Sequence, residues 1–231
     1  MRNVMRRFAR WHIWLGWLAG VPLLLWTLSG LVMVAKPIEE VRGEHLRIEA
    51  EAKPSFAGNP RPIAFRVDGS PQAVELRSFI QHGRFVTLVT RPDDSVERFD
   101  ATTGMRVPAV DEQEARGIVA RLIVGGDKIA SVHLTSEDNP PLDFRRPIAA
   151  WQVTLADGTR VYVGRDSGEI AAVSTRWWRV FDFMWGLHIM DLQTREDTHH
   201  PLLIGFAALA LVSTVLGVTL LFRRRRAALR T

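Results

Sequence analysis

Hydrophobic residues concentrate in two long stretches, one near each end of the chain. Residues 11–35 contain a single readily ionisable side chain, His12, and residues 201–222 contain no charged side chain. Both stretches reach the ~20 residues that an α-helix needs to cross the apolar layer of a bilayer. The pattern therefore predicts two transmembrane helices, one over residues 11–35 and one over residues 201–222.

Arginines flank both stretches at their outer ends. They are Arg2, Arg6, Arg7 and Arg10 before the first stretch, and Arg223, Arg224, Arg225, Arg226 and Arg230 after the second. The positive-inside rule assigns such clusters to the cytoplasm, and two crossings return the chain to its starting side. We therefore expect a protein of the bacterial inner membrane, with both termini cytoplasmic and residues 36–200 on the periplasmic side.

A cleaved signal peptide is the alternative for the first stretch, because a basic segment followed by an apolar run also describes one. The apolar run is longer than the roughly 7–15 residues of a signal peptide, and no small-x-small site closes it. Trp11, Trp14 and Trp17 form an aromatic belt at its cytoplasmic end, as in a permanent anchor. These features favour a transmembrane helix that stays in the protein.

The middle of the chain alternates apolar and polar residues as β-strands do. The expected strands occupy residues 73–76, 85–90, 95–100, 130–135, 149–155, 160–164 and 169–173. Turn-forming residues at 156–158 and 166–168 favour hairpins. Residues 111–124 instead space their apolar side chains as a helix, after Asp111 as N-cap. The predicted fold class is α+β, with an antiparallel sheet plus a helix between two transmembrane helices.

The segments next to the predicted helices differ from this domain. Residues 36–60 mix charges with Pro and Gly, as connecting segments do, and residues 39–47 are expected to extend the first helix. Residues 176–200 hold an aromatic-rich, helix-like stretch and a loop. The predicted division is a basic cytoplasmic N-terminus (1–10), a first span (11–35), a periplasmic domain (36–175), an aromatic interfacial helix and loop (176–200), a second span (201–222) and a basic cytoplasmic tail (223–231).

Composition excludes several classes of function. The net charge of +5 would suggest a nucleic-acid partner, but the basic residues lie mainly beside the apolar stretches, so none is expected. The absence of cysteine excludes disulfides, thiolate metal ligands and cysteine nucleophiles. The chain has no nucleotide-binding, zinc-protease or serine-hydrolase motif, and its carboxylates are scattered. No catalytic residue is therefore predicted.

Three sequence features together resemble the PepSY-associated transmembrane family. They are His12-x-Trp14-Leu15-Gly16, Leu28-Ser29-Gly30 and the segment WQVTLADGTRVYVGRDSGEI. The resemblance implies a PepSY-like periplasmic domain. Larger members have four spans, and some look like reductases that hold b-type haem between transmembrane histidines and reduce iron–siderophore complexes. This chain has two predicted spans, so a homodimer, or another membrane subunit, would restore four helices.

Three histidines are the candidate haem-iron ligands. His12 lies in the first turn of an apolar span, where an ionisable group is costly unless it faces protein, ligand or the interface. His188 and His199 are expected near the outer membrane interface, close to aromatic residues that suit a flat apolar slot. Because a span rises ~30 Å, His12 and His188 cannot share one haem, and two sites in a dimer are required.

The same histidines also have a simpler interpretation. His12 is then an interfacial residue with its polar tip among the lipid headgroups, and the aromatic segment is an amphipathic helix anchored by its tryptophans. His188 and His199 become ordinary polar residues of that interface. His45, His82 and His133 are isolated and have no recognised metal spacing.

Two functions follow from these alternatives. The first is a homo-oligomeric membrane protein with haem b, passing electrons from a cytoplasmic or quinone donor to a periplasmic acceptor such as a ferric chelate. The second is a non-catalytic module that the two spans tether to the lipid bilayer, where it binds a periplasmic protein or restrains a protease. A histidine inside the first span favours the first function, because a tether does not need one.

Overall fold

The computed structural model describes residues 2–48 and 73–228, and the chain divides into two compact units. The helical unit contains both ends of the chain, Met1–Pro37 and Arg179–Thr231, whereas Ile38–Trp178 form the second unit. The part of the predicted connecting segment at residues 49–60 lies outside the described residues. The finer division into six segments stays a prediction.

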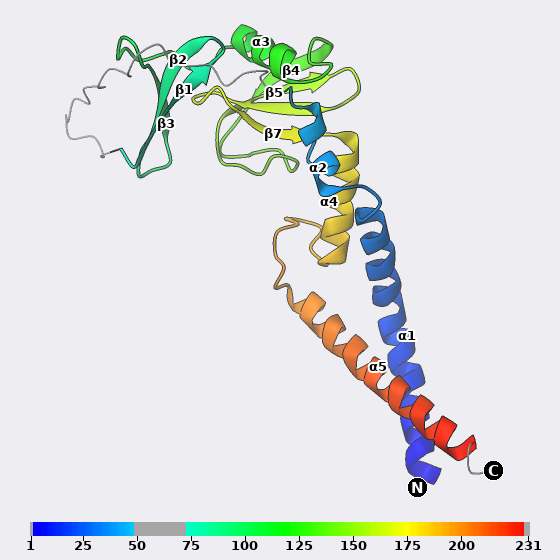
Figure 1. Cartoon of the computed structure of the whole chain (residues 1–231). Helices are drawn as coiled ribbons and strands as arrows, with labels where there is room; N and C mark the ends of the chain where they lie inside the picture. Colours follow the sequence, from blue (N-terminus) through cyan, green and yellow to red (C-terminus); the bar gives the residue numbers. More distant parts are fainter. Residues whose placement is uncertain (1, 49–72, 229–231) are drawn as a thin grey trace. The chain divides into compact units, whose positions relative to one another are not determined.

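Two long antiparallel helices dominate the helical unit, α1 (Arg2–Met33) and α5 (Pro201–Ala228), and they cross each other in Figure 1. The most apolar 18-residue windows of Arg6–Met33 and Pro201–Arg223 have mean hydropathies of 1.7 and 2.3. Only 17% and 6% of their most apolar windows are buried by the rest of the protein. The core helix of a soluble protein would be mostly buried, so these apolar surfaces suit a lipid bilayer.

Small residues form the contact between α1 and α5. Ala19 on α1 is 1% exposed, and Ala210 and Ser213 on α5 are also buried. Small side chains let helix backbones approach closely in membranes, where apolar packing replaces the hydrophobic effect. By contrast, a Cβ added at Gly16 or Gly20 would meet nothing within 4 Å. The GxxxG pair of α1 therefore lies outside its contact with α5.

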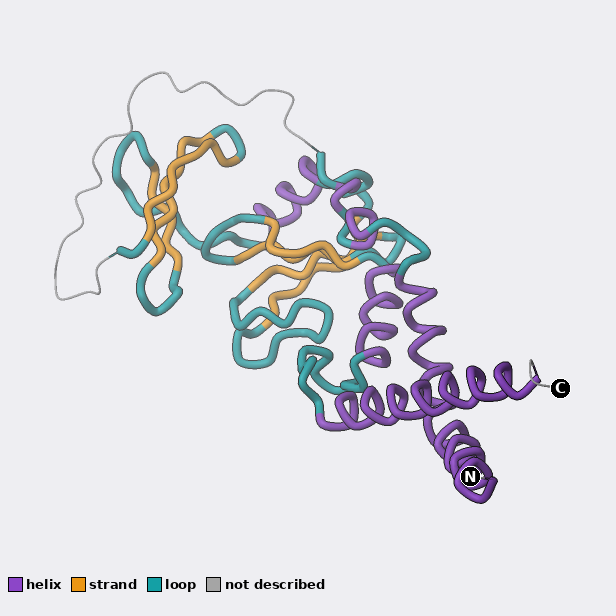
Figure 2. Tube along the Cα trace, turned by 60° about the horizontal axis from the view of Figure 1, so that its bottom comes forward, coloured by secondary structure: helices purple, strands orange, loops and turns teal. Residues whose placement is uncertain are grey.

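The second unit contains two antiparallel sheets (Figures 1 and 2). The first is formed by β1 (Glu75–Gln81), β2 (Arg84–Thr90) and β3 (Val96–Asp100), and the second by β4 (Ile129–Thr135), β5 (Ala150–Leu155), β6 (Arg160–Gly164) and β7 (Ile170–Ser174), each in chain order. The remaining helices are α2 (Ile38–Val41), the 3₁₀ turn η1 (Glu44–Leu46), α3 (Glu112–Leu122) and α4 (Arg176–His188), whose first three residues belong to this unit. The predicted α+β class between two apolar helices is confirmed.

Two local predictions differ from the structure. The strand expected at residues 73–76 is β1, which begins at Glu75 and continues to Gln81. Most of β1 is exposed at the edge of its sheet, so burial imposes no regular alternation on its residues. The expected extension of the first helix over residues 39–47 is wrong, because α1 ends at Met33 and Pro37 disfavours helical backbone in the residue before it.

The helix α3 packs against the second sheet, and the two together form the hydrophobic core. Asp111 caps it, because its side chain accepts a hydrogen bond of 2.7 Å from the backbone N–H of Glu114. Ala115, Ile118 and Val119 on its inner face are fully buried. They pack in one cluster with apolar residues of β5, β6 and β7, namely Val153, Leu155, Val161, Val163 and Val173. Each buried Val or Ile side chain contributes roughly 1.5–3 kcal/mol.

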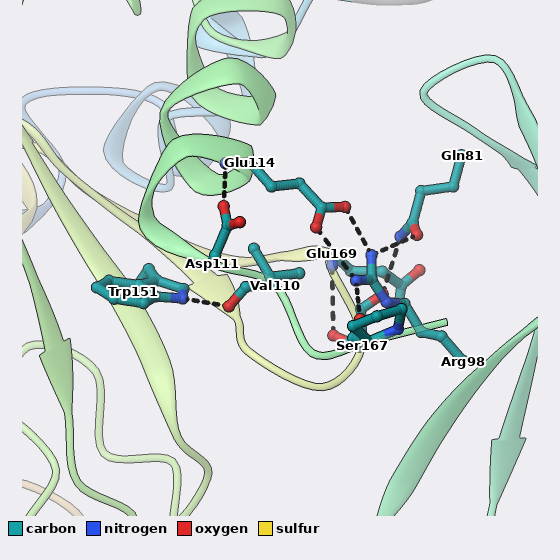
Figure 3. A network of polar contacts seen from close by, with 9 residues as sticks. Gln81, Arg98, Val110, Asp111, Glu114, Trp151, Ser167 and Glu169 are labelled. Carbon is teal, nitrogen blue, oxygen red and sulfur yellow. Dashed lines mark hydrogen bonds and ion pairs between the residues drawn. The ribbon is translucent and has the colours of Figure 1, made fainter. Parts of the chain in front are cut away.

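A buried arginine connects β3 to α3 (Figure 3). Arg98 is 2% exposed, and its Nη1 lies 2.9 Å from Glu114 Oε1 on α3. Its Nη2 donates a 2.6 Å hydrogen bond to the carbonyl oxygen of Pro108. A buried guanidinium must be paired in this way, because an unpaired buried charge costs several kcal/mol. Arg98 therefore joins the first sheet to the helix that covers the second.

The β6–β7 turn makes a second connection between the sheets. Gln81 Nε2 donates a 2.8 Å hydrogen bond to the carbonyl oxygen of Ser167 in that turn (Figure 3). Gly168 has φ +68°, and a Cβ there would lie 2.7 Å from Arg98 Nη1. Only glycine combines this backbone conformation with so close an approach. The hairpin predicted at residues 166–168 thus also docks the two sheets.

Replacing Arg98 should therefore destabilise the second unit. We expect Arg98→Met to lower its free energy of unfolding by about 2–3 kcal/mol, because the charged hydrogen bonds to Glu114 and Pro108 are lost. Arg116→Met is the matched control, since Arg116 is an exposed partner of Glu112 one turn away and its pair contributes about 0.3–0.5 kcal/mol. Chemical denaturation of the purified protein measures both. Equal effects of the two substitutions would contradict a linking role for Arg98.

A second polar network surrounds Asp143 in the loop between β4 and β5. The carboxylate is buried and accepts hydrogen bonds from the Tyr162 hydroxyl at 2.8 Å and from Arg160 Nη1 at 3.0 Å. Tyr162 stacks on Phe144, with ring centroids 4.4 Å apart. Burial alone would raise the pKa of Asp143, but the hydrogen bond from Tyr162 and the charge of Arg160 outweigh it and lower that pKa. The carboxylate therefore stays ionised.

This lowered pKa gives Asp143 a pH-dependent contribution to stability. The contribution is fully present above the unfolded-state pKa of about 3.9 and is lost as pH falls through the lower folded-state pKa. We expect Asp143→Asn to reduce the free energy of unfolding by about 2 kcal/mol at pH 7, and the difference from wild type to shrink below about pH 4. Tyr162→Phe keeps the stacked ring and should lose only part of this free energy of unfolding. Denaturation midpoints across pH measure the difference, and a constant gap would contradict the assignment.

Candidate functional site

His188, the last residue of α4, lies against α1 in the helical unit. Its Nδ1 is 3.0 Å from the hydroxyl oxygen of Ser29, a fully buried residue of α1. A Cβ added at the neighbouring Gly30 would lie 3.7 Å from His188 Cε1. The two small residues thus form a shallow seat on α1 in which the imidazole rests.

The hydrogen bonds of Ser29 indicate the tautomer of His188. The Ser29 hydroxyl donates to the carbonyl oxygen of Trp26 at 3.1 Å, which uses its only hydrogen. When the hydroxyl hydrogen is directed to Trp26, the same oxygen can accept a hydrogen bond from Nδ1–H of His188. In that tautomer Nε2 of His188 carries the lone pair. A neutral imidazole with one nitrogen held in this way is the usual form of a histidine metal ligand.

Trp26 fixes the end of α4 on which His188 sits. Its Nε1 donates a 2.7 Å hydrogen bond to the carbonyl oxygen of His188, one of the carbonyls that a helix end leaves without a partner. The two rings are tilted by 42° with centroids 6.4 Å apart. Both backbone and side chain of His188 are therefore tied to α1.

The loop after α4 is folded back onto that helix. Arg195 Nη1 lies 2.5 Å from the buried carboxylate of Asp182 on α4, and Trp185 Nε1 donates to the carbonyl oxygen of Arg195 at 3.1 Å. Asp191 accepts hydrogen bonds from Thr194 and from the backbone of residues 193–197, which lower its pKa. A Cβ at Gly186 would lie 2.7 Å from Arg195 Cγ, so glycine permits this packing. The loop thus supports α4 close to His188.

His12 occupies a second seat, between α1 and α5. A Cβ added at Gly217 of α5 would lie 2.8 Å from His12 Cε1 and 3.2 Å from Nε2, so the imidazole fills the space of the missing side chain. Nδ1 of His12 is buried and has no hydrogen-bond partner among the described residues. A buried nitrogen without a partner costs free energy, so a group that bonded it would stabilise the protein.

The two imidazoles lie at different levels of α1. His12 precedes Ser29 by 17 residues. At 1.5 Å rise per residue, the levels of His12 and His188 are ~26 Å apart along the helix. One planar cofactor cannot reach both, so any ligand of the two histidines needs two separate sites.

The third predicted ligand, His199, is exposed in the loop before α5. Its backbone N–H donates to Asp197 Oδ1 at 2.8 Å, and its Nδ1 is 3.4 Å from Thr198 Oγ1. No hydrogen bond among the described residues links His199 to His12 or His188. Within that part of the chain, no group of three His, Asp or Glu residues forms a site for a bare metal ion. Haem differs, because it needs only one or two protein ligands.

The architecture agrees with one known family. The family model described as PepSY-associated TM region matches residues 9–231. The chain belongs to this family. No curated protein and no solved structure matches it. This PepSY-associated TM chain is thus a membrane protein, and the match includes both apolar helices and the whole domain between them.

Sequence reasoning found the histidines of this PepSY-associated TM chain but not the residues that hold them. Ser29 and Gly30 were part of the Leu28-Ser29-Gly30 motif, and a small residue such as Gly217 in an apolar span permits close helix contacts without identifying a partner. Ser29 and His188 are 159 residues apart in the chain, and no spacing rule connects them. A polar residue next to glycine in an apolar span was the one available signal, because a hydroxyl there needs a partner.

The contact between His12 and Gly217 can be tested by a double-mutant cycle. We expect Gly217→Ala to lower the free energy of unfolding by about 1–3 kcal/mol, because the new methyl group overlaps His12. The loss should appear as a lower thermal midpoint of the protein in detergent. In a His12→Ala background the same substitution should be neutral or stabilising. Gly205→Ala is the matched control, since a Cβ there meets nothing within 4 Å. An equal effect of Gly217→Ala in both backgrounds would contradict the contact.

Proposed function

We propose that this PepSY-associated TM chain is a haem-binding membrane protein that carries electrons across the bilayer. The observation that carries the proposal is His188, whose Nδ1 lies 3.0 Å from the Ser29 hydroxyl oxygen, so that Nε2 is the nitrogen left for a ligand. Haem iron accepts such a neutral imidazole nitrogen, and a fixed partner on the other nitrogen orients the ring. A plain membrane tether gives no reason for this arrangement.

The residues at both levels suit haem b. His188 would bind through Nε2 beside Trp26, an aromatic residue suited to a flat apolar slot. Nδ1 of His12 is buried without a hydrogen-bond partner among the described residues, and its ring packs against Gly217 from the apolar part of α1. Bound at these positions, haem b supplies one-electron transfer at its iron. The two levels lie near opposite ends of α1, as a path across the membrane requires.

We assign the second ligand at each level to another copy of the chain. One copy offers one imidazole at each level, and a twofold-related copy would present the same two histidines. The face of α1 at Gly16 and Gly20 is open, with nothing within 4 Å of an added Cβ, so another helix can approach closely. Such a homodimer has four spanning helices and two bis-histidine positions.

The direction of electron flow follows from the predicted topology. By the positive-inside rule, the arginine clusters favour a His12 level near the cytoplasm and a His188 level near the periplasm. The donor is then a cytoplasmic reductant or a membrane quinone. The acceptor is periplasmic, and a ferric chelate is our first candidate.

Substitution of the seated histidines tests this function directly. Protein purified from haem-replete cells should show the absorption spectrum of a b-type haem. We expect His12→Ala and His188→Ala each to remove about half of the bound haem, because each disrupts one of two levels. Ser29→Ala keeps both ligands but should weaken haem binding about 10–100-fold, because the Nδ1 partner of His188 is lost.

His199→Ala is the control, because that imidazole is exposed in the loop before α5. It should retain the wild-type haem content. A colourless, fully folded preparation would contradict the proposal. Haem loss on His199→Ala with retention on His188→Ala would instead assign the periplasmic ligand to His199.

A further inference from the structure

A cavity of about 660 Å³ lies in the Ile38–Trp178 unit. Its size is within the range of small-molecule sites, roughly 300–1,000 Å³. Phe144 and Trp178 give its wall two aromatic faces, and alanines and a valine of β7 complete the apolar part. None of its described lining residues is a histidine. The cavity is therefore separate from the proposed haem ligands.

Three arginines line the cavity: Arg42, Arg47 and Arg146. All three side chains belong to exposed residues, and none forms an ion pair among the described residues. They come from two segments, because Arg42 and Arg47 flank η1 whereas Arg146 lies between β4 and β5, so the fold and not one local run brings them together. Guanidinium groups are planar forks that match carboxylate and phosphate groups.

The carboxylates of the cavity do not cancel this charge. Asp143 already pairs with Arg160 at 3.0 Å and accepts a hydrogen bond from Tyr162. Glu44 is the other acidic lining residue. One carboxylate against three arginines leaves the cavity with a surplus of positive charge. Arg145 places a further guanidinium 5.9 Å from the Trp178 ring. The site thus combines surplus positive charge with flat apolar walls.

We propose that this cavity binds a small soluble polyanion with a flat apolar body, such as an aromatic polycarboxylate or an aryl phosphate. Arg42, Arg47 and Arg146 hold the anionic groups, while Phe144 and Trp178 contact the ring. Glu44 accepts a hydrogen bond from a hydroxyl or amine of the ligand. The binding site does not depend on haem.

Calorimetric titration of the full-length protein in phosphatidylcholine nanodiscs tests this site. The probes are benzene-1,3,5-tricarboxylate, citrate as a non-aromatic trianion, and benzene-1,3,5-trimethanol as a neutral ring. We expect the aromatic tricarboxylate to bind most tightly, citrate more weakly and the neutral ring not at all. Higher salt should weaken binding of both anions, because ionic screening reduces their attraction to the arginines.

Three variants separate the parts of the site. Arg146→Gln should weaken binding of the aromatic tricarboxylate about tenfold, because one charge-assisted hydrogen-bond donor is lost. Arg116→Gln removes an arginine that already pairs on α3 and should leave binding unchanged. Trp178→Leu should weaken the aromatic tricarboxylate but not citrate. Circular dichroism verifies that each variant is folded.

Three results would overturn the proposal. The first is no binding of any anion at millimolar concentration, which would leave ordinary solvated arginines. The second is equal weakening by Arg146→Gln and Arg116→Gln. The third is loss of binding when phosphatidylglycerol replaces phosphatidylcholine, which would show that lipid headgroups occupy the cavity. None of these results depends on the haem content of the protein.

Discussion

An imidazole on an apolar helix needs a partner for its polar nitrogens, and the helical unit depends on this constraint. At one level Ser29 supplies the partner, and Trp26 bonds the backbone of the same histidine, so α4 is tied to α1 through His188. At the other level Gly217 gives His12 space but the described residues give its Nδ1 no partner. The first arrangement gives Nδ1 of His188 its partner within one copy, whereas Nδ1 of His12 has none among the described residues. The proposed haem, held between two copies, would give each imidazole a further partner.

The two units differ in where their charged side chains lie and how they are paired. In the Ile38–Trp178 unit the buried ionic groups are paired, Arg98 with Glu114 and Asp143 with Arg160, because an unpaired buried charge would be costly. The three arginines of the cavity are exposed and form no ion pair within the part of the chain that the structure describes, which leaves them available to a ligand. The helical unit excludes charge from its apolar spans and keeps polar chemistry to a few seated side chains.

The sequence predicted those elements whose cause is local. Long apolar stretches give α1 and α5, and an acidic start after Asp111 gives α3. An Asp-Gly turn gives the β5–β6 hairpin, and an Asp-Ser-Gly turn gives the β6–β7 hairpin. It missed what depends on contacts between distant residues. The division into two sheets and the full length of the edge strand β1 are set by strand pairing and exposure. The seats of His12 and His188 likewise require residues more than 150 positions away, which no spacing rule identifies.

The central claim is that two copies complete two bis-histidine haem positions. Electron paramagnetic resonance of the oxidised, purified wild-type protein, combined with its haem-to-protein ratio, tests it most directly. Two haems per dimer with one imidazole from each copy predict a low-spin, six-coordinate ferric signal at about one haem per chain. A folded protein without haem, or a high-spin five-coordinate signal throughout, would contradict the account.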